Sequence, residues 1–230
     1  MLREILSVFR TEDEASRMKS TFLEALELSR ELTEVAGEHF FDRPPSHEDI
    51  VAVHDRDVEL NKLQRRLRKQ VIAHMTLNSS RRDAQHGLLW MSLSKDVERI
   101  GDYCKNLVQI YEEGGAPLPQ DENAASLREV RAVAEELSRQ AGPVLEGSDS
   151  GTALELIRRG RDSNRLCDEL VRRVSRGPYD AATTTTLALG TRYYKRIQSH
   201  LLNVLSSVVM PLHKLDYYDE RSLPGRDDED

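Results

Sequence analysis

Apolar side chains recur every three to four residues through most of the chain, whereas the strict alternation of a β-strand is nearly absent. This spacing is typical of helices that bury one apolar stripe. Stretches rich in Gly, Pro, Asn and Ser interrupt it and mark turns. Six helices are expected, over residues 11–37, 46–77, 83–114, 121–145, 152–175 and 180–213. The pattern therefore predicts an all-α protein of six long helices.

The strongest interruption is the connector Ala116-Pro117-Leu118-Pro119-Gln120, between the third and fourth helices. Two prolines in five residues are incompatible with a continuous helix. We therefore expect one three-helix unit over residues 1–115 and a second over residues 120–214. Residues 215–230 end in four acidic side chains, and we expect them to form an acidic, disordered tail.

The third and sixth predicted helices resemble each other in sequence. The offset is constant, because 180 − 83 and 203 − 106 both equal 97. Five identities share this register: Asp83 and Asp180, Ala84 and Ala181, Arg99 and Arg196, Ile100 and Ile197, and Asn106 and Asn203. Polar identities in a fixed register are harder to explain by chance than apolar ones, so we interpret the two units as a tandem repeat.

Glu98 and Asp102 are the most informative pair in the chain. They are four residues apart in a predicted helix, so both carboxylates project from one face. Like charges at this spacing disfavour each other by a few tenths of a kcal/mol unless a cation lies between them. A metal ion or a basic side chain such as Arg99 could supply that charge. The pair could also belong to a solvated acidic face.

The repeat does not preserve this pair. At an offset of 97, Glu98 corresponds to Lys195 and Asp102 corresponds to Ser199. An ammonium group has no lone pair, so Lys195 cannot bind a metal while it is charged. Any metal chemistry is therefore expected in the first unit only.

Composition excludes several classes of protein. A net charge of −7 and a pI near 5.6 argue against nucleic acid as the main ligand. The sequence has neither an apolar run of the roughly 18–20 residues that cross a bilayer nor a visible signal peptide. The two cysteines, Cys104 and Cys167, are expected to be reduced thiols of a cytoplasmic protein. No glycine-rich phosphate loop or nucleophile–base pair supports an enzyme.

The stretch Glu98-Arg99-Ile100-Gly101-Asp102, followed by Asn106, resembles the signature of the PhoU family of phosphate-uptake regulators. In that family an E/D-x-x-x-D motif occurs once in each three-helix repeat. Asp57-Val58-Glu59-Leu60-Asn61 resembles a second acidic stretch of the family, from which Asn61 departs, and Asn164-Arg165-Leu166-Cys167-Asp168 is its weaker counterpart. The resemblance implies two antiparallel three-helix bundles packed side by side, in a cytoplasmic protein without catalytic activity.

The resemblance also implies a function. Family members restrain phosphate uptake and the phosphate-starvation response through contacts with an ABC phosphate transporter and a sensor histidine kinase. We expect this chain to regulate phosphate uptake and the starvation response through a transporter component, a sensor kinase or both, as a homodimer or larger homo-oligomer that is at most peripheral to the membrane. The alternative is a metal-binding or accessory module of a different ion transporter.

Some family members bind iron, zinc or other divalent ions through the motif. Magnesium or manganese would also suit carboxylate oxygens that converge from several helices. Glu98 and Asp102 would then need further ligands. If the second and third helices face each other, Asp57, Asn61 and His54 could supply them.

Overall fold

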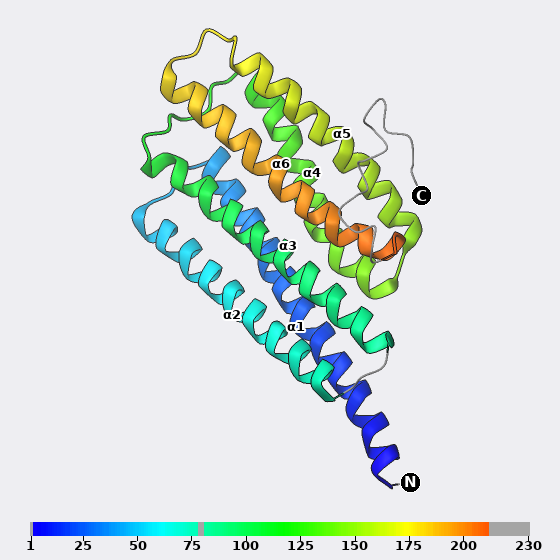
Figure 1. The fold of residues 1–230 in the computed structure, drawn as a ribbon. Coiled ribbons are helices and arrows are strands. Elements are labelled where there is room, and N and C mark those ends of the chain that lie inside the picture. The colour runs from blue at the N-terminus through cyan, green and yellow to red at the C-terminus, as the bar shows by residue number, and fades with distance from the viewer. Residues whose placement is uncertain (1, 78–80, 212–230) are drawn as a thin grey trace.

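Among the residues that it describes, the computed structural model contains six helices, whose arrangement is drawn in Figure 1. It describes the backbone of residues 2–77 and 81–211, and the side chains of residues 14–76 and 84–211. The helices are α1 (Leu2–Phe41), α2 (His47–Leu77), α3 (Arg81–Glu112), α4 (Glu122–Gly147), α5 (Ser150–Val174) and α6 (Ala181–Val209). The all-α class and the number of helices are therefore confirmed.

Acidic and hydroxyl side chains begin four of the helices. The carboxylates of Asp121, Asp149 and Asp180 each accept a hydrogen bond from a backbone N–H three residues later. At the start of α2, Ser46 and Asp49 cap each other reciprocally: the Asp49 N–H donates to Ser46 Oγ at 3.2 Å, and the Ser46 N–H donates to the Asp49 carboxylate at 2.9 Å. Such caps satisfy the N–H groups that have no partner inside a helix.

The ends of α1 differ from the prediction. The helix begins at Leu2 instead of near Thr11, and it continues past Gly37 to Phe41. Gly37 lies inside the helix, where the absence of a side chain allows close packing. A Cβ atom there would lie 2.9 Å from Arg131 Nε and 3.2 Å from the Tyr194 hydroxyl. At the other end of the chain, α6 stops at Val209, whereas His213 and the predicted tail of residues 215–230 lie outside the described residues.

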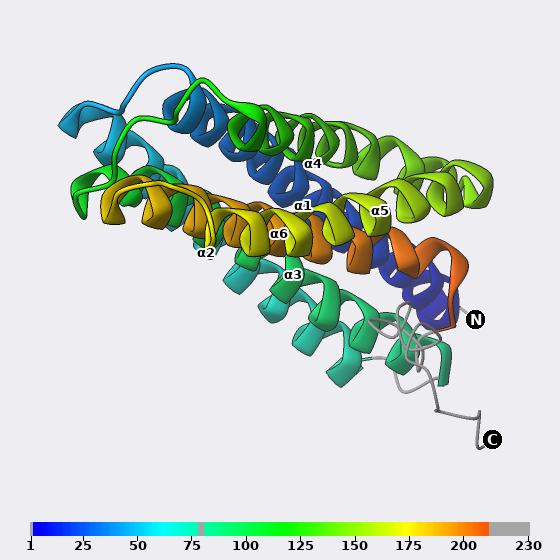
Figure 2. The same ribbon diagram turned by 90° about the horizontal axis from the view of Figure 1, so that it is seen from above.

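The six helices form two groups of three. In the first group α1 packs against both α2 and α3, and in the second α4 and α5 both pack against α6. The groups meet where α3 lies beside α6 and α1 lies beside α4 (Figures 1 and 2). One cluster of buried side chains, from Met18 to Leu205, runs through both groups. The division of the chain at residues 115 and 120 stays a prediction.

Aromatic side chains fill the part of the core where the two groups meet. Phe40 is 1% exposed and lies near the rings of Phe41, Tyr111 and Tyr194, with ring centres 5.0–6.3 Å apart. The Tyr111 hydroxyl donates to the Phe40 carbonyl at 2.7 Å. Gly190 of α6 makes room for Phe40, because a Cβ atom there would overlap the phenyl ring.

Polar contacts connect α3 to α6. The buried carboxylate oxygen Oδ1 of Asp96 lies 2.8 Å from His200 Nδ1 and accepts a hydrogen bond from the Asn203 side chain at 2.8 Å. The Tyr103 ring stacks on the His200 ring, with centres 5.8 Å apart. His200 is thus an interface residue between the two groups.

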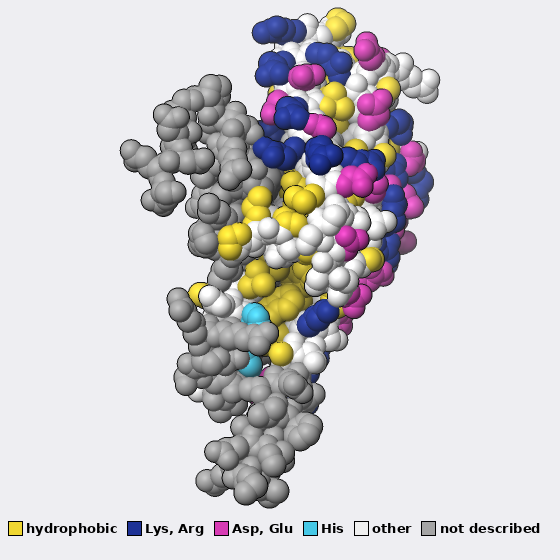
Figure 3. Space-filling view, turned by 90° about the vertical axis from the view of Figure 1, so that its right-hand side faces the viewer, with side chains coloured by type: hydrophobic (Ala, Val, Ile, Leu, Met, Phe, Trp, Pro, Cys, Tyr) yellow, Lys and Arg dark blue, Asp and Glu magenta, His cyan; other side chains and the backbone are white. Residues whose placement is uncertain are grey.

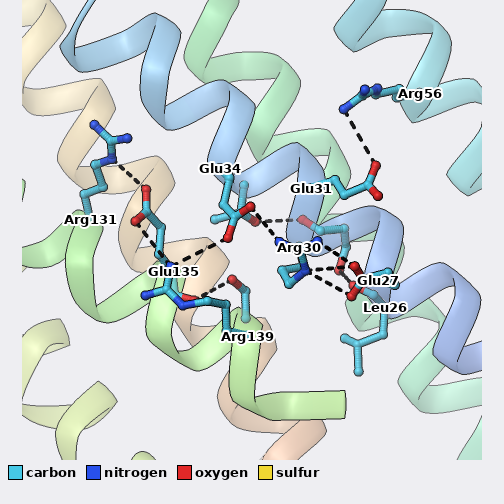
Figure 4. A network of polar contacts seen from close by, with 12 residues as sticks. Leu26, Glu27, Arg30, Glu31, Glu34, Arg56, Arg131, Glu135 and Arg139 are labelled. Atoms are coloured by element: carbon cyan, nitrogen blue, oxygen red, sulfur yellow. Dashed lines mark hydrogen bonds and ion pairs between the residues drawn. The ribbon is translucent and has the colours of Figure 1, made fainter. Parts of the chain in front are cut away.

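Charged side chains connect α1 to α4, as Figure 4 shows. Glu34 of α1 lies 2.6 Å from Arg30 and 3.6 Å from Arg139 of α4. Glu135 of α4 in turn lies 2.7 Å from Arg131 and 3.8 Å from Arg139. Where α1 meets α4, the surface therefore carries acidic and basic side chains in pairs.

The connector between the groups is held by a threonine. Thr186 is fully buried in the unusual run Thr183–Thr186, where it donates to the Ala182 carbonyl at 3.0 Å. The same hydroxyl accepts the backbone N–H of Ala116 at 2.9 Å. Hydroxyl groups in helices commonly bond back to the preceding turn, and here the second bond fixes the start of the connector.

Candidate functional site

The predicted site lies where α2 faces α3. Asp57 and Asn61 lie on α2, and Glu98 and Asp102 lie on α3. Gly101 lets the two helices approach, because a Cβ atom there would lie 2.5 Å from Leu60 Cδ2 and 3.2 Å from Asp57 Oδ1. The structure therefore brings Asp57 towards the Glu98–Asp102 turn.

A lysine ammonium group lies between the carboxylates. Lys105 Nζ donates to Asp57 Oδ2 at 2.9 Å and to Asp102 Oδ1 at 3.2 Å. Arg99 lies 3.1 Å from the other oxygen of Asp102 and 3.8 Å from Glu98. The charge that the acidic pair requires is thus supplied by two side chains of the same helix.

Asn61 and His54, the other two predicted ligands, each contact a neighbouring side chain. Asn61 donates to Asp57 Oδ2 at 3.4 Å, so its amide group lies beside the acidic cluster. His54 is not part of the cluster, since its Nε2 lies 3.1 Å from the Gln109 amide nitrogen. Asp57 Oδ1 is buried without a hydrogen-bond partner.

These residues, as arranged, do not fit a metal ion. Within the described ranges, no three His, Cys, Asp or Glu side chains converge closely enough to hold one. A metal also requires the lone pairs that Asp57 and Asp102 direct at Lys105. A site for iron, zinc, magnesium or manganese stays a prediction, and binding would require Lys105 to move. Its predicted ligands are Glu98, Asp102, Asp57, Asn61 and His54.

Glu98 lies in an unfavourable electrostatic environment. Burial raises the pKa of its carboxyl group above the ordinary value, and the nearby charge of Asp102 raises it further. The folded protein therefore binds this proton more tightly than the unfolded chain does. The stability that results is present at low pH and is lost as the pH rises through the folded-state pKa.

We expect Glu98→Gln to stabilise the protein at pH 7 by on the order of a few tenths of a kcal/mol, because it removes a desolvated charge beside Asp102. The gain should disappear at pH 4, where the wild-type carboxyl group is itself protonated. Urea unfolding at both pH values measures it. Glu169→Gln, at an exposed site on α5, is the control. A loss of stability at pH 7 would contradict the electrostatic account.

The second group of helices has a comparable arrangement. Lys195 corresponds to Glu98 and lies 2.6 and 2.7 Å from the two carboxylate oxygens of Asp168 on α5. Ser199, which corresponds to Asp102, donates to the Lys195 carbonyl at 2.8 Å and accepts a 3.3 Å bond from Asn164. In both groups a lysine–aspartate pair connects two neighbouring helices at the motif.

Sequence reasoning missed Lys105. Its position three residues after Asp102 is a signal for an ion pair along one helix. Its contact with Asp57, 48 residues away, depends on how α2 packs against α3. The sequence alone does not determine that packing.

The two cysteines are not part of any reactive group. Cys104 and Cys167 are both buried. Burial raises the pKa of each thiol to about 12, so neither is an activated thiolate at neutral pH.

Comparisons with known proteins point to one family. Residues 22–111, which include the whole Asp57–Asp102 region, match the sequence model of the PhoU domain. No curated protein matches the chain.

Two crystal structures have a similar fold. PhoU from Pseudomonas aeruginosa superposes with a TM-score of 0.76 and 17% sequence identity, over 88% of this chain and 98% of that one. The phosphate transport system regulatory protein PhoU from Streptococcus pneumoniae gives a TM-score of 0.73 and 13% identity, over 86% and 95% of the two chains. At these identities the likeness shows the fold alone.

Proposed function

We propose that this chain is a regulator of phosphate transport of the PhoU family, since residues 22–111 match the PhoU domain and two PhoU structures share its fold. The observation that carries the proposal is the match of residues 22–111 to the PhoU domain, because that segment contains the Glu98–Asp102 turn. The regulation would extend to the phosphate-starvation response.

We propose that the protein acts by binding other proteins and without catalysing a reaction. Two hollows among the described residues are shallow: one of about 600 Å³ lies between α1 and α4, and one of about 300 Å³ lies between α4 and α5. Neither contains the Glu98–Asp102 turn. Long helices instead offer extended exposed faces, which suit protein partners.

The proposed partners are a component of an ABC phosphate transporter, a sensor histidine kinase, or both, at the cytoplasmic side of the membrane. None of the helices among the described residues is long and apolar enough to span a bilayer. We propose that the contact with a membrane transporter is made with one of the transporter's cytoplasmic parts.

Affinity purification from phosphate-replete cells tests this proposal. We expect a tagged chain to recover a phosphate transporter component or a sensor kinase, and the tag alone to recover neither. Deleting the gene should raise phosphate uptake in phosphate-rich medium, and restoring it should reverse the change. Recovery of neither partner together with unchanged phosphate uptake would overturn the proposal. An altered uptake of another ion would instead favour the accessory module of a different transporter.

A further inference from the structure

A stripe of basic side chains follows the outer face of α2, the helix at the edge of the molecule in Figure 1. Its four members are all exposed and recur at the spacing of one helix face: Lys62, Arg65, Arg66 and Lys69. Only Arg66 has an ion-pair partner among the described residues, Glu24 of α1 at 3.7 Å, and both of these side chains are more than half exposed. The basic stripe is therefore largely without counter-charge in that part of the chain.

The basic stripe is unfavourable for an isolated helix. Lys62 and Arg66 are four residues apart, as are Arg65 and Lys69, and like charges at this spacing repel each other. The helix dipole favours cations in the last turn only, whereas α2 continues beyond Lys69 to Leu77. An anionic partner would relieve this repulsion.

The corresponding helix of the second group differs. At an offset of 107, equal to 164 − 57, the stripe corresponds to Glu169, Arg172, Arg173 and Arg176. These arginines lie in or after the last turn of α5, which ends at Val174, and the helix dipole favours cations there. Figure 3 shows the side of the molecule where α5 lies in Figure 1, with dark blue and magenta side chains intermixed over its upper part. Of these two helices, α2 alone carries a basic stripe in its interior.

The chain also carries a segment of the opposite charge, residues 216–230. Two of its side chains are basic, Arg221 and Arg226, and seven are acidic: Asp216, Asp219, Glu220, Asp227, Asp228, Glu229 and Asp230. This acidic segment lies outside the described residues and follows α6 in the chain. Its charge is complementary to that of the basic stripe.

α6 ends on the same side of the molecule as the basic stripe. α3 and α6 run antiparallel, as two of their contacts show: Asp96–His200 and Tyr103–Tyr193. The end of α6 therefore lies beside the start of α3. The start of α3 in turn lies beside the end of α2, because a Cβ atom at Gly87 would lie 2.5 Å from the Met75 sulfur. All three helix ends are in the right-hand half of Figure 1.

The acidic segment is long enough to reach the stripe. Because α3 separates α6 from α2, the axes of these two helices are about 20 Å apart at the usual spacing of packed helices. The stripe from Lys62 to Lys69 is about 10 Å long at the rise of an α-helix. From Pro211, the last described residue, to Asp227 the chain can extend over about 53 Å. A segment tethered at such a distance needs only a low affinity to dock.

We propose that the acidic segment docks on the basic stripe of α2 in the same molecule. Its carboxylates supply the counter-charge that the stripe lacks, and the docked segment shields the stripe from other anionic partners. The contact is therefore autoinhibitory for any partner that binds this face of α2. It involves neither the Glu98–Asp102 turn nor the seam between the groups, and it does not depend on the proposed regulatory function.

Paramagnetic relaxation enhancement tests the contact. A nitroxide on Ser222→Cys labels the segment selectively, because Cys104 and Cys167 are buried. The amide NMR signals of residues 62–72 should be strongly weakened, whereas those of residues 158–169 on α5 should keep their intensity. About 1 M NaCl should restore the weakened signals, since the Debye length falls to about 3 Å there.

Charge exchange within one chain identifies the contacting residues. The variant Lys62→Glu/Arg65→Glu/Lys69→Glu should abolish the weakening, and the addition of Asp227→Lys/Asp228→Lys/Glu229→Lys should bring it back. The matched control is Arg158→Glu/Arg165→Glu/Arg172→Glu at exposed α5 positions, which should leave the weakening unchanged. Circular dichroism verifies that every variant is folded, as expected for exposed substitutions.

A mixture distinguishes docking within one molecule from docking on another. Isotope-labelled chain without nitroxide and unlabelled chain with nitroxide are refolded together, so that any assembly contains both. The signals of residues 62–72 should then keep their intensity, and their weakening would assign the segment to a second copy and overturn the proposal. Full intensity in the spin-labelled wild type would leave the stripe to a separate anionic partner and would overturn it equally. So would weakening that persists after charge reversal of the stripe.

Discussion

Lys105→Met is expected to lower the free energy of unfolding by about 3 kcal/mol, the lower end of the range for breaking a buried ion pair. The Asp57 side chain is 6% exposed, and Lys105 is the cation that lies against it. Without the ammonium group, Asp57 would be a buried charge whose remaining hydrogen-bond partner is the Asn61 amide at 3.4 Å. Urea unfolding of the variant and the wild type measures the loss.

A double variant separates the lost ion pair from lost packing. Lys105→Met/Asp57→Leu removes both charges and should recover most of the lost stability, because an apolar pair often replaces a buried ion pair at little cost. Lys95→Met, at an exposed position of the same helix, should change stability by less than about 0.5 kcal/mol. If Lys105→Met behaves like Lys95→Met, the pair does not hold α2 against α3.

The same variant tests the predicted metal site. Lys105→Met removes the group that competes for the lone pairs of Asp57 and Asp102. If these carboxylates can bind a metal, added Mn²⁺ or Zn²⁺ should raise the melting temperature of this variant more than that of the wild type. An equal response of both proteins would leave no support for a site at these residues.

Phe40→Ala is expected to cost about 3–5 kcal/mol, the usual range for deleting a buried aromatic ring. The loss should be near the upper end, because Phe40 packs against aromatic side chains of α1, α3 and α6, and Gly190 beside its ring has no side chain to fill the space. Thermal unfolding followed by circular dichroism measures the effect. Phe40→Leu should cost less, since it refills part of the cavity.

Phe40 also reports on how the two groups unfold. Its ring contacts side chains from both groups, so its removal should weaken them together and preserve a single transition. Leu154→Ala, at a site that is 52% exposed on α5, should leave the melting temperature nearly unchanged. Two separate transitions in Phe40→Ala would mean that the groups are independent folding units.

The sequence was sufficient for the helices because apolar spacing reports directly on which face a helix buries. It failed at Gly37, where a glycine that normally signals a helix end serves close packing against Tyr194. The same limit applies to the site. Glu98 and Asp102 could be placed on one turn, but the position of Asp57 against Lys105 depends on the register of α2 on α3. Local periodicity carries no information about that register.

The two lysine–aspartate pairs have a consequence for how the protein depends on its surroundings. A helix bundle held by a bound metal is stabilised in proportion to the logarithm of the free metal concentration once the site begins to fill. Lys105 and Lys195 are part of the chain, so their charge is present at fixed stoichiometry in every molecule. The charge that these ammonium groups place between α2 and α3 and between α5 and α6 is therefore independent of metal starvation and of chelators.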